Sequence, residues 1–172
     1  MQNKSTPVKW TILKSSLAVF GLCTFFGIGI AAAGPMYVEG VAAPISKVMP
    51  ELQKALGQHH FKVVLHLDIL KMIKAKQHIL HIPNLNKPGF SDVQSVVFCN
   101  PFFFNQLLNA HWESSAACPL TLTVYGRGGK SYIVYPKRVA LTGNTPALNV
   151  AKKIDKAVIG ALTSVPGAQP VR

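Results

Sequence analysis

Residues 92–125, DVQSVVFCNPFFFNQLLNAHWESSAACPLTLTVY, form the stretch that decides the fold expected for this chain. The β-branched and aromatic run at 93–98 predicts a strand that ends at Cys99. Asn100 is a favoured helix-capping residue, and Pro101 suits the first position of a helix because that position needs no N–H donor. The first half of the stretch therefore predicts a strand, a cysteine at its end, and a short apolar helix.

The second half of the stretch contains the other cysteine of this region. Cys118 and Pro119 come directly before a predicted strand at 120–125, and a further strand at 131–135 follows a glycine-rich turn. Two strands joined by such a short turn form an antiparallel hairpin. The two cysteines are therefore each expected at a junction between elements.

The elements outside this stretch follow from hydrophobic periodicity. Helical spacing predicts helices at 45–57 and directly after Asp68, while 61–67 predicts a strand. Thr145 and Pro146 are expected as the N-cap and first turn of a last helix with an apolar stripe at 148–162. Residues 164–172 are expected to be a flexible tail. The residues expected to face the core in the first half of the domain are Ile45, Val48, Met49, Leu52, Ala55, Leu56, Phe61, Val63, Leu65, Leu67, Leu70, Met72 and Ile73. Interleaved helices and strands with a late hairpin predict an α+β fold, with a single mainly antiparallel sheet backed by helices.

Composition and charge narrow the classes of function. The chain has 172 residues, 49% hydrophobic and 14% charged, which is too apolar for a disordered protein. Eighteen basic residues against six acidic ones give a net charge of +12. Such an excess suits anionic lipid, an acidic protein or nucleic acid. No arginine-rich helix or zinc-finger spacing accompanies it, so nucleic acid is not an expected partner.

The N-terminal region carries the signature of a membrane segment. Residues 15–38 contain no charged side chain, and a helix of this length spans the ~30 Å hydrocarbon core of a bilayer. The lysines of residues 1–14 mark a cytoplasmic basic flank, which places the rest of the chain outside the inner (cytoplasmic) membrane. The alternative is a cleaved signal peptide, because Ala31, Ala32 and Ala33 have the small-residue pattern of a cleavage site. Both predict a domain in the periplasm or outside the cell.

Several short motifs resemble those of a known family. They are Asp68 after a strand, Lys74-Ala75-Lys76, Cys99-Asn100-Pro101, the strand-opening Pro119, and Leu141-Thr142-Gly143-Asn144. Residues 44–163 thereby resemble the DUF302 family, a domain of unknown function with a TBP-like α+β fold. The resemblance implies this fold and no established catalytic activity. Two positions depart from the pattern, because Ile69 stands where many members have a histidine, and Cys118 precedes Pro119, whereas some members have the cysteine after the proline.

Cys99 and Cys118 are the candidate site residues, with Asp68, Asn100, Pro101 and Pro119 as motif and capping positions. A structural disulfide is one reading, because cysteine pairs outside the cytoplasm usually bond. Unpaired buried thiols are the second. The third is a functional thiol for redox exchange, sulfur transfer or metal binding, since a helix N-terminus after Cys99 favours a thiolate.

His111 lies between the two cysteines in the sequence. Together with Cys99 and Cys118 it would form a set of soft ligands that suits copper or zinc. The spacing of the three residues matches no standard metal motif.

Two functions from different classes remain open. The first is a non-catalytic interaction module held at the inner membrane, which docks to an acidic membrane or respiratory protein. The second is a thiol-based redox, sulfur- or metal-carrier protein that uses Cys99 and Cys118. The anchor, the positive charge and the lack of an enzyme motif favour the first.

Overall fold

The computed structural model of the protein describes residues 34–171. The predicted basic flank, 1–14, and the predicted apolar segment as far as residue 33 lie outside the described residues. No helix within 34–171 is both long enough and apolar enough to cross a bilayer. The end of the predicted segment is corrected, because 36–38 belong to a strand that hydrogen-bonds within the sheet of the domain.

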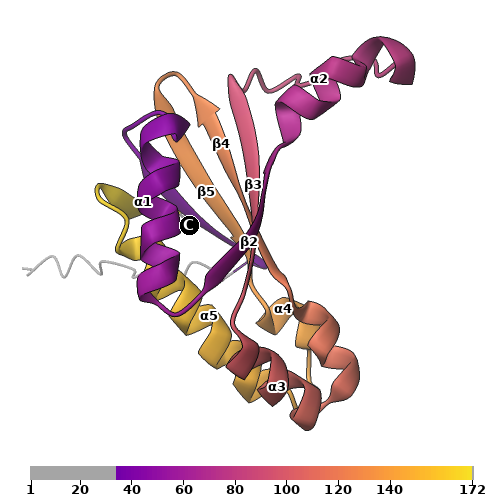
Figure 1. Ribbon diagram of the computed structural model, residues 1–172, viewed down its shortest axis with the longest axis vertical. Coiled ribbons are helices and arrows are strands. Elements are labelled where there is room, and N and C mark those ends of the chain that lie inside the picture. The colour runs from indigo at the N-terminus through magenta and orange to yellow at the C-terminus, as the bar shows by residue number, and fades with distance from the viewer. Residues whose placement is uncertain (1–33, 172) are drawn as a thin grey trace, which may run out of the picture. The chain divides into compact units, whose positions relative to one another are not determined.

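The described chain is an alternation of strands and helices (Figure 1). Its elements in order are β1 Met36–Val41, α1 Ile45–Gln58, β2 Lys62–Asp68, α2 Ile69–Leu80, β3 Asp92–Cys99, α3 Pro101–Ala110, the 3₁₀ helix η1 Trp112–Ala117, β4 Leu120–Arg127, β5 Lys130–Pro136, α4 Val139–Thr142, α5 Leu148–Thr163 and β6 Ala168–Pro170.

The strands form one six-stranded antiparallel sheet in the order β2-β3-β4-β5-β1-β6. The predicted α+β class with a single antiparallel sheet backed by helices is confirmed. The register defines two ends of the sheet. The cysteine end is the end at which β3 stops at Cys99 and at which β4 and β1 begin. The register shows this, because Phe98 pairs with Leu120 and Met36 pairs with Pro136. At the hairpin end, the β4–β5 turn lies beside the start of β3.

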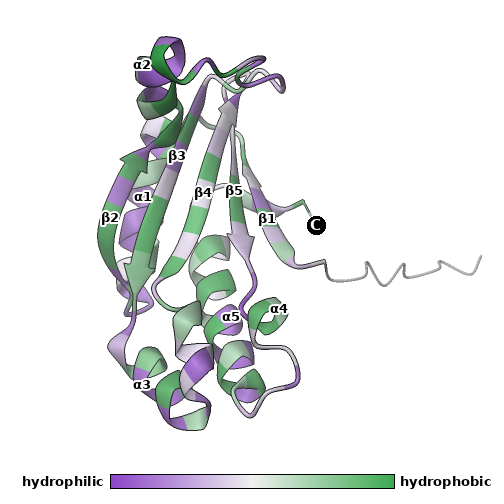
Figure 2. Ribbon diagram, turned by 90° about the vertical axis from the view of Figure 1, so that its right-hand side faces the viewer, coloured by the Kyte–Doolittle hydropathy of each residue, from purple (hydrophilic) through white to green (hydrophobic). Residues whose placement is uncertain are grey.

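Helices α1 and α5 cover one face of the sheet and build the core with it (Figure 1). The opposite face carries no helix in the described chain, as the strands turned toward the viewer in Figure 2 show. All six residues predicted to form the buried stripe of the first helix are buried in α1. This stripe follows from helical spacing alone, which is why the sequence predicted it correctly.

Strand β2 departs from simple alternation. Val63 pairs with Phe98 and Leu65 with Val97, so Val64 is an extra, bulged residue. A bulge shifts the side chains beyond it to the other face of the strand. Leu65, predicted to face the core, is therefore 48% exposed.

Helix α2 contacts β3, buries only Leu70 of its first turn, and extends beyond the hairpin end of the sheet (Figure 1). Asp68 caps the helix as predicted, accepting a hydrogen bond from Lys71 N at 3.0 Å. Leu70 is buried, but Met72 was wrongly predicted to face the core and is 54% exposed. The core ends at the first turn, so nothing in the described chain covers the rest of the apolar face.

The C-terminal segment is not the predicted flexible tail. Val165 is buried in the core, and β6 pairs with β1 through Glu39–Pro170, Gly40–Gln169 and Val41–Ala168. Because β1 would otherwise be the edge of the sheet, its free backbone groups give the tail hydrogen-bond partners. Such pairing over a long sequence distance leaves no local pattern in the tail.

Candidate functional site

Cys99 is the last residue of β3 and is half-buried at the cysteine end of the sheet. The next residue, Asn100, caps α3, because its Oδ1 accepts hydrogen bonds from Phe102 N at 2.9 Å and Phe103 N at 3.2 Å. Its Nδ2 donates to the carbonyl oxygen of His60 at 3.0 Å. The cap predicted from the sequence is thus present, with Pro101 as the first residue of the helix.

Cys118 is buried in the core at the end of η1, and its peptide bond to Pro119 is cis. The pairing of Phe98 with Leu120 places the end of β3 beside Cys118. Both cysteines are nevertheless free thiols, so the disulfide considered from the sequence is not formed. Cys118 is therefore an unpaired buried thiol, the second alternative considered from the sequence, while Cys99 is unpaired and partly exposed to solvent.

Burial raises the pKa of the Cys118 thiol to about 11. The nearby Cys99 raises this pKa further, while the guanidinium of Arg138 opposes the rise. The thiolate, and not the thiol, is the nucleophile and metal ligand. Cys118 is therefore protonated at neutral pH and poorly suited to either role.

A buried polar cluster lies beside Cys118. Arg138 donates from Nη1 to the carbonyl oxygen of Ala117 at 3.1 Å, and its guanidinium carbon lies 5.4 Å from the ring centroid of Tyr135. Asp155 accepts hydrogen bonds from Tyr135 OH at 2.8 Å, Arg138 N at 2.7 Å and Val139 N at 3.0 Å. The cluster ties the end of β5 and the start of α4 to α5.

Sequence reasoning missed this cluster, although one signal was present. Asp155 lies on the buried stripe of α5 with Ala151, Ile154 and Val158. A carboxylate on such a stripe is rarely buried without hydrogen-bond partners. Its position predicts a polar partner inside the core, but not which one.

His111 does not join the two cysteines. Its Nδ1 lies 3.0 Å from Ser114 Oγ, and its Nε2 lies 3.5 Å from Glu113 Oε2. Within residues 34–171, no three His, Cys, Asp or Glu side chains come together as a metal site. The predicted copper or zinc cluster of Cys99, Cys118 and His111 is therefore not formed, because η1 turns the imidazole toward its own neighbours.

Helix α2 exposes large apolar side chains at the hairpin end of the sheet. At roughly 100° per residue, Met72 and Ile79 lie about 200° and 180° around the helix from the buried Leu70. These two side chains are 54% and 73% exposed. We call the apolar residues Met72, Ile79 and Leu80, with the exposed lysines 71, 74 and 76 of the same helix, the α2 ridge.

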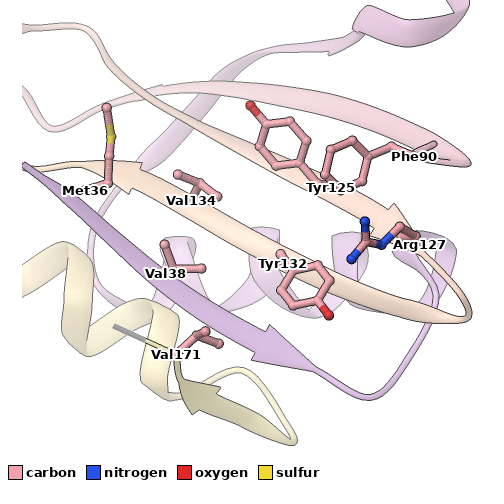
Figure 3. A pocket seen from close by; sticks show the side chains of 8 residues that line it. All are labelled: Met36, Val38, Phe90, Tyr125, Arg127, Tyr132, Val134 and Val171. Atoms are coloured by element: carbon pink, nitrogen blue, oxygen red, sulfur yellow. The ribbon is translucent and has the colours of Figure 1, made fainter. Parts of the chain in front are cut away.

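The uncovered face of the sheet contains an open hollow of about 540 Å³ (Figure 3). Its lining is Met36, Val38, Phe90, Tyr125, Arg127, Tyr132, Val134 and Val171. The rings of Phe90 and Tyr125 lie 5.0 Å apart, and the Arg127 guanidinium lies 5.7 Å from the Phe90 ring. The lining offers apolar surface and one cation, but no carboxylate, thiol or imidazole for acid–base or nucleophilic chemistry.

Comparison with known proteins agrees with this architecture. The family model described as domain of unknown function DUF302 matches residues 38–165. The chain belongs to the DUF302 family. The crystal structure of an uncharacterized conserved DUF302 protein from Bacillus stearothermophilus is similar, with 25% identity and a TM-score of 0.67. The match covers 77% of this chain and 99% of that one. A search of curated proteins finds no match.

The DUF302 motifs named from the sequence have mainly structural roles in this chain. Asp68 and Asn100 are helix caps, and Thr142 of the Leu-Thr-Gly-Asn motif donates to the carbonyl oxygen of Arg138 at 3.2 Å. The departure at Ile69 puts an apolar residue beside the capping aspartate. The departure at Cys118 puts its thiol in the core of the DUF302 domain.

Proposed function

We propose that this DUF302 protein is a membrane-anchored, exported interaction module, without catalytic activity of its own, that docks an acidic protein through the α2 ridge. The observation that carries the proposal is the ridge itself. Its apolar side chains are 54–73% exposed, and the helix that carries them protrudes from the sheet (Figure 1). Large apolar side chains on a protruding helix are typical of a docking surface.

Charge indicates the kind of partner. Residues 69–91 contain four lysines and no aspartate or glutamate, and the lysines of the ridge are exposed. Exposed apolar side chains on a lysine-rich helix fit a groove whose rim carries carboxylates. A second copy of this chain fits poorly, since a twofold interface would bring the same lysines toward each other.

The uncharged residues 15–35, which precede β1, support the membrane part of the proposal. Their uncharged length and the lysines before them favour a single span with the domain outside. The partner is accordingly expected in or on the same membrane, where a respiratory or other membrane protein would present its acidic surface.

The alternative, a thiol-based redox, sulfur- or metal-carrier protein, is less well supported. It needs reactive thiolates at Cys99 and Cys118. The raised pKa of Cys118 keeps that thiol protonated at neutral pH, and its burial limits access by a second thiol or a metal ion.

The proposal is tested by native sizing of the full-length protein extracted in mild detergent. In the wild type we expect a complex larger than the monomer at low salt, which dissociates in 1 M NaCl because the Debye length falls to ~3 Å. The variant Lys71→Glu/Lys74→Glu/Lys76→Glu should lose the complex at all salt concentrations.

The matched control reverses three exposed lysines of α5, as Lys152→Glu/Lys153→Glu/Lys156→Glu. It makes the same change in net charge on another helix and should keep the complex. A wild type that runs as a lone monomer at low salt contradicts the proposal. Equal loss of the complex in both variants contradicts the assignment to α2.

A further inference from the structure

The cysteine end of the domain carries a second exposed apolar surface, far from the α2 ridge along the sheet. Exposed fractions are 76% for Phe102, 70% for Trp112 and 63% for Leu141, with 42% for Leu108 and 39% for Phe104. We call these five residues the aromatic patch. Figure 2 shows α3 and α4 beyond this end of the sheet, each with apolar segments.

The patch is built by three neighbouring elements. Phe104 and Leu108 lie on one side of α3 and Phe102 on the other, Trp112 begins η1, and Leu141 belongs to α4. Helix α3 contacts η1, and η1 contacts α4. No aspartate, glutamate, lysine or arginine occurs from Val93 to Trp112, so α3 presents no charged side chain to its surroundings.

The described chain also starts at the cysteine end. Lys137 N, just before α4, donates a hydrogen bond to the carbonyl oxygen of Pro35 at 2.8 Å, and Met36 pairs with Pro136. The apolar run that begins at Ser15 therefore leads into the domain beside the start of α4, the helix that carries Leu141 of the patch. Because β1 begins at Met36, almost no linker separates this run from the sheet.

We propose that the aromatic patch lies in the interfacial layer of the bilayer, as a second contact that fixes the orientation of the domain on its membrane. This inference rests on the membrane anchoring proposed above. Each extended residue spans at most about 3.6 Å, so a span that ends by Pro35 holds the cysteine end against the membrane surface. Tryptophan and phenylalanine are the side chains that favour this interfacial layer.

The opposite placement of the two surfaces supports the orientation. With the aromatic patch in the bilayer, the α2 ridge at the hairpin end points away from the membrane, where a partner protein reaches it (Figure 1). The occupant of the patch is thus lipid, and the occupant of the ridge is protein. A shallow depth of roughly 5–10 Å is expected for an apolar face held at the interface.

Tryptophan fluorescence tests this placement, because the chain has two tryptophans, Trp10 and Trp112. The full-length Trp10→Phe variant is placed in phosphatidylcholine–phosphatidylglycerol vesicles with bromine on the acyl chains. Bromine near the headgroup should reduce Trp112 emission at least about twofold, and bromine near the chain ends should reduce it less, as the interfacial depth requires. Flotation of the same vesicles measures anchoring separately.

The matched control moves the reporter to the other end of the domain, as Trp10→Phe/Trp112→Phe/Ile79→Trp. Ile79 is exposed on the α2 ridge, and its replacement should not be quenched. Protein that floats with vesicles but shows no quenching of Trp112 overturns the inference and leaves anchoring intact. Equal quenching at positions 112 and 79 also overturns the inference, because the orientation is then absent. Protein that does not float overturns both the anchoring and the placement of the patch.

Discussion

Replacing Asp155 with alanine should be among the most destabilising single changes in this domain. The carboxylate is buried and accepts three hydrogen bonds, from Tyr135 OH, Arg138 N and Val139 N. The Tyr135 side chain is fully buried, so its orphaned hydroxyl would find no water and costs about 2 kcal/mol. Arg138 N adds about 1–2 kcal/mol and the half-buried Val139 N less, which gives a loss of roughly 4 kcal/mol.

A double-mutant cycle separates the hydroxyl from the two backbone donors. Tyr135→Phe removes one donor and leaves Asp155 its other two, so it should cost about 1 kcal/mol. In the Asp155→Ala background the same change should instead recover about 2 kcal/mol, because it removes the hydroxyl that has lost its partner. Lys156→Ala, on the exposed side of the same helix, should change stability by less than about 0.5 kcal/mol.

Equilibrium urea unfolding followed by circular dichroism measures these free energies. The reasoning is refuted if Asp155→Ala costs less than about 1 kcal/mol, since buried donors left unsatisfied cannot be that cheap. Strict additivity of Asp155→Ala and Tyr135→Phe would refute the assignment of the coupling to their hydrogen bond.

Three further predictions concern the thiols, alkaline pH and the C-terminal segment. Alkylation at pH 7.5 should modify Cys99 in the native protein and leave Cys118 unmodified until urea is added. Mass spectrometry measures the labelling of each cysteine. A disulfide between Cys99 and Cys118, or equal labelling of the two, would contradict this prediction. Burial raises the folded pKa of Cys118 from 9.0 to about 11 and, together with the Asp155 carboxylate, raises that of Tyr135, so the folded state binds protons more tightly than the unfolded state. The stability that Cys118 contributes is present below about pH 9 and is lost as pH rises through about 11. The contribution of Tyr135 is present below its unfolded pKa of 10.0 and falls at higher pH, so Tyr135→Phe should flatten the fall in unfolding free energy above pH 10. Val165→Ala should lower the free energy of unfolding by about 1–2 kcal/mol, since this side chain is buried in the core. A change within experimental error in urea unfolding would instead favour a flexible C-terminal tail.

The sequence by itself determined the features that depend on neighbours within a few residues. The helix caps at Asp68 and Asn100 require a polar side chain two or three residues before a free N–H, a relation that the sequence displays directly. The buried stripe of α1 and the β4–β5 hairpin follow in the same way from periodicity and turn residues. These local signals, with the family motifs, were sufficient for the fold class.

The candidate site depended on contacts that the sequence does not display. Which of two cysteines is buried, and whether His111 turns toward them, depends on how η1 packs against α3 and α4. The bond between Asp155 and Tyr135 joins residues twenty positions apart, so no short pattern reveals it. The bulge at Val64 and the pairing of β6 with β1 likewise belong to strands that meet only in the folded sheet.

The two surfaces proposed for binding show the same division. Their composition, a lysine-rich apolar helix and an uncharged aromatic helix, is written in the sequence. Only the antiparallel register of the folded sheet decided that the α2 ridge lies at the hairpin end and that the aromatic patch lies at the cysteine end, where β1 begins. Periodicity fixes which side chains share a face of one element, whereas the packing of distant elements fixes what that face meets.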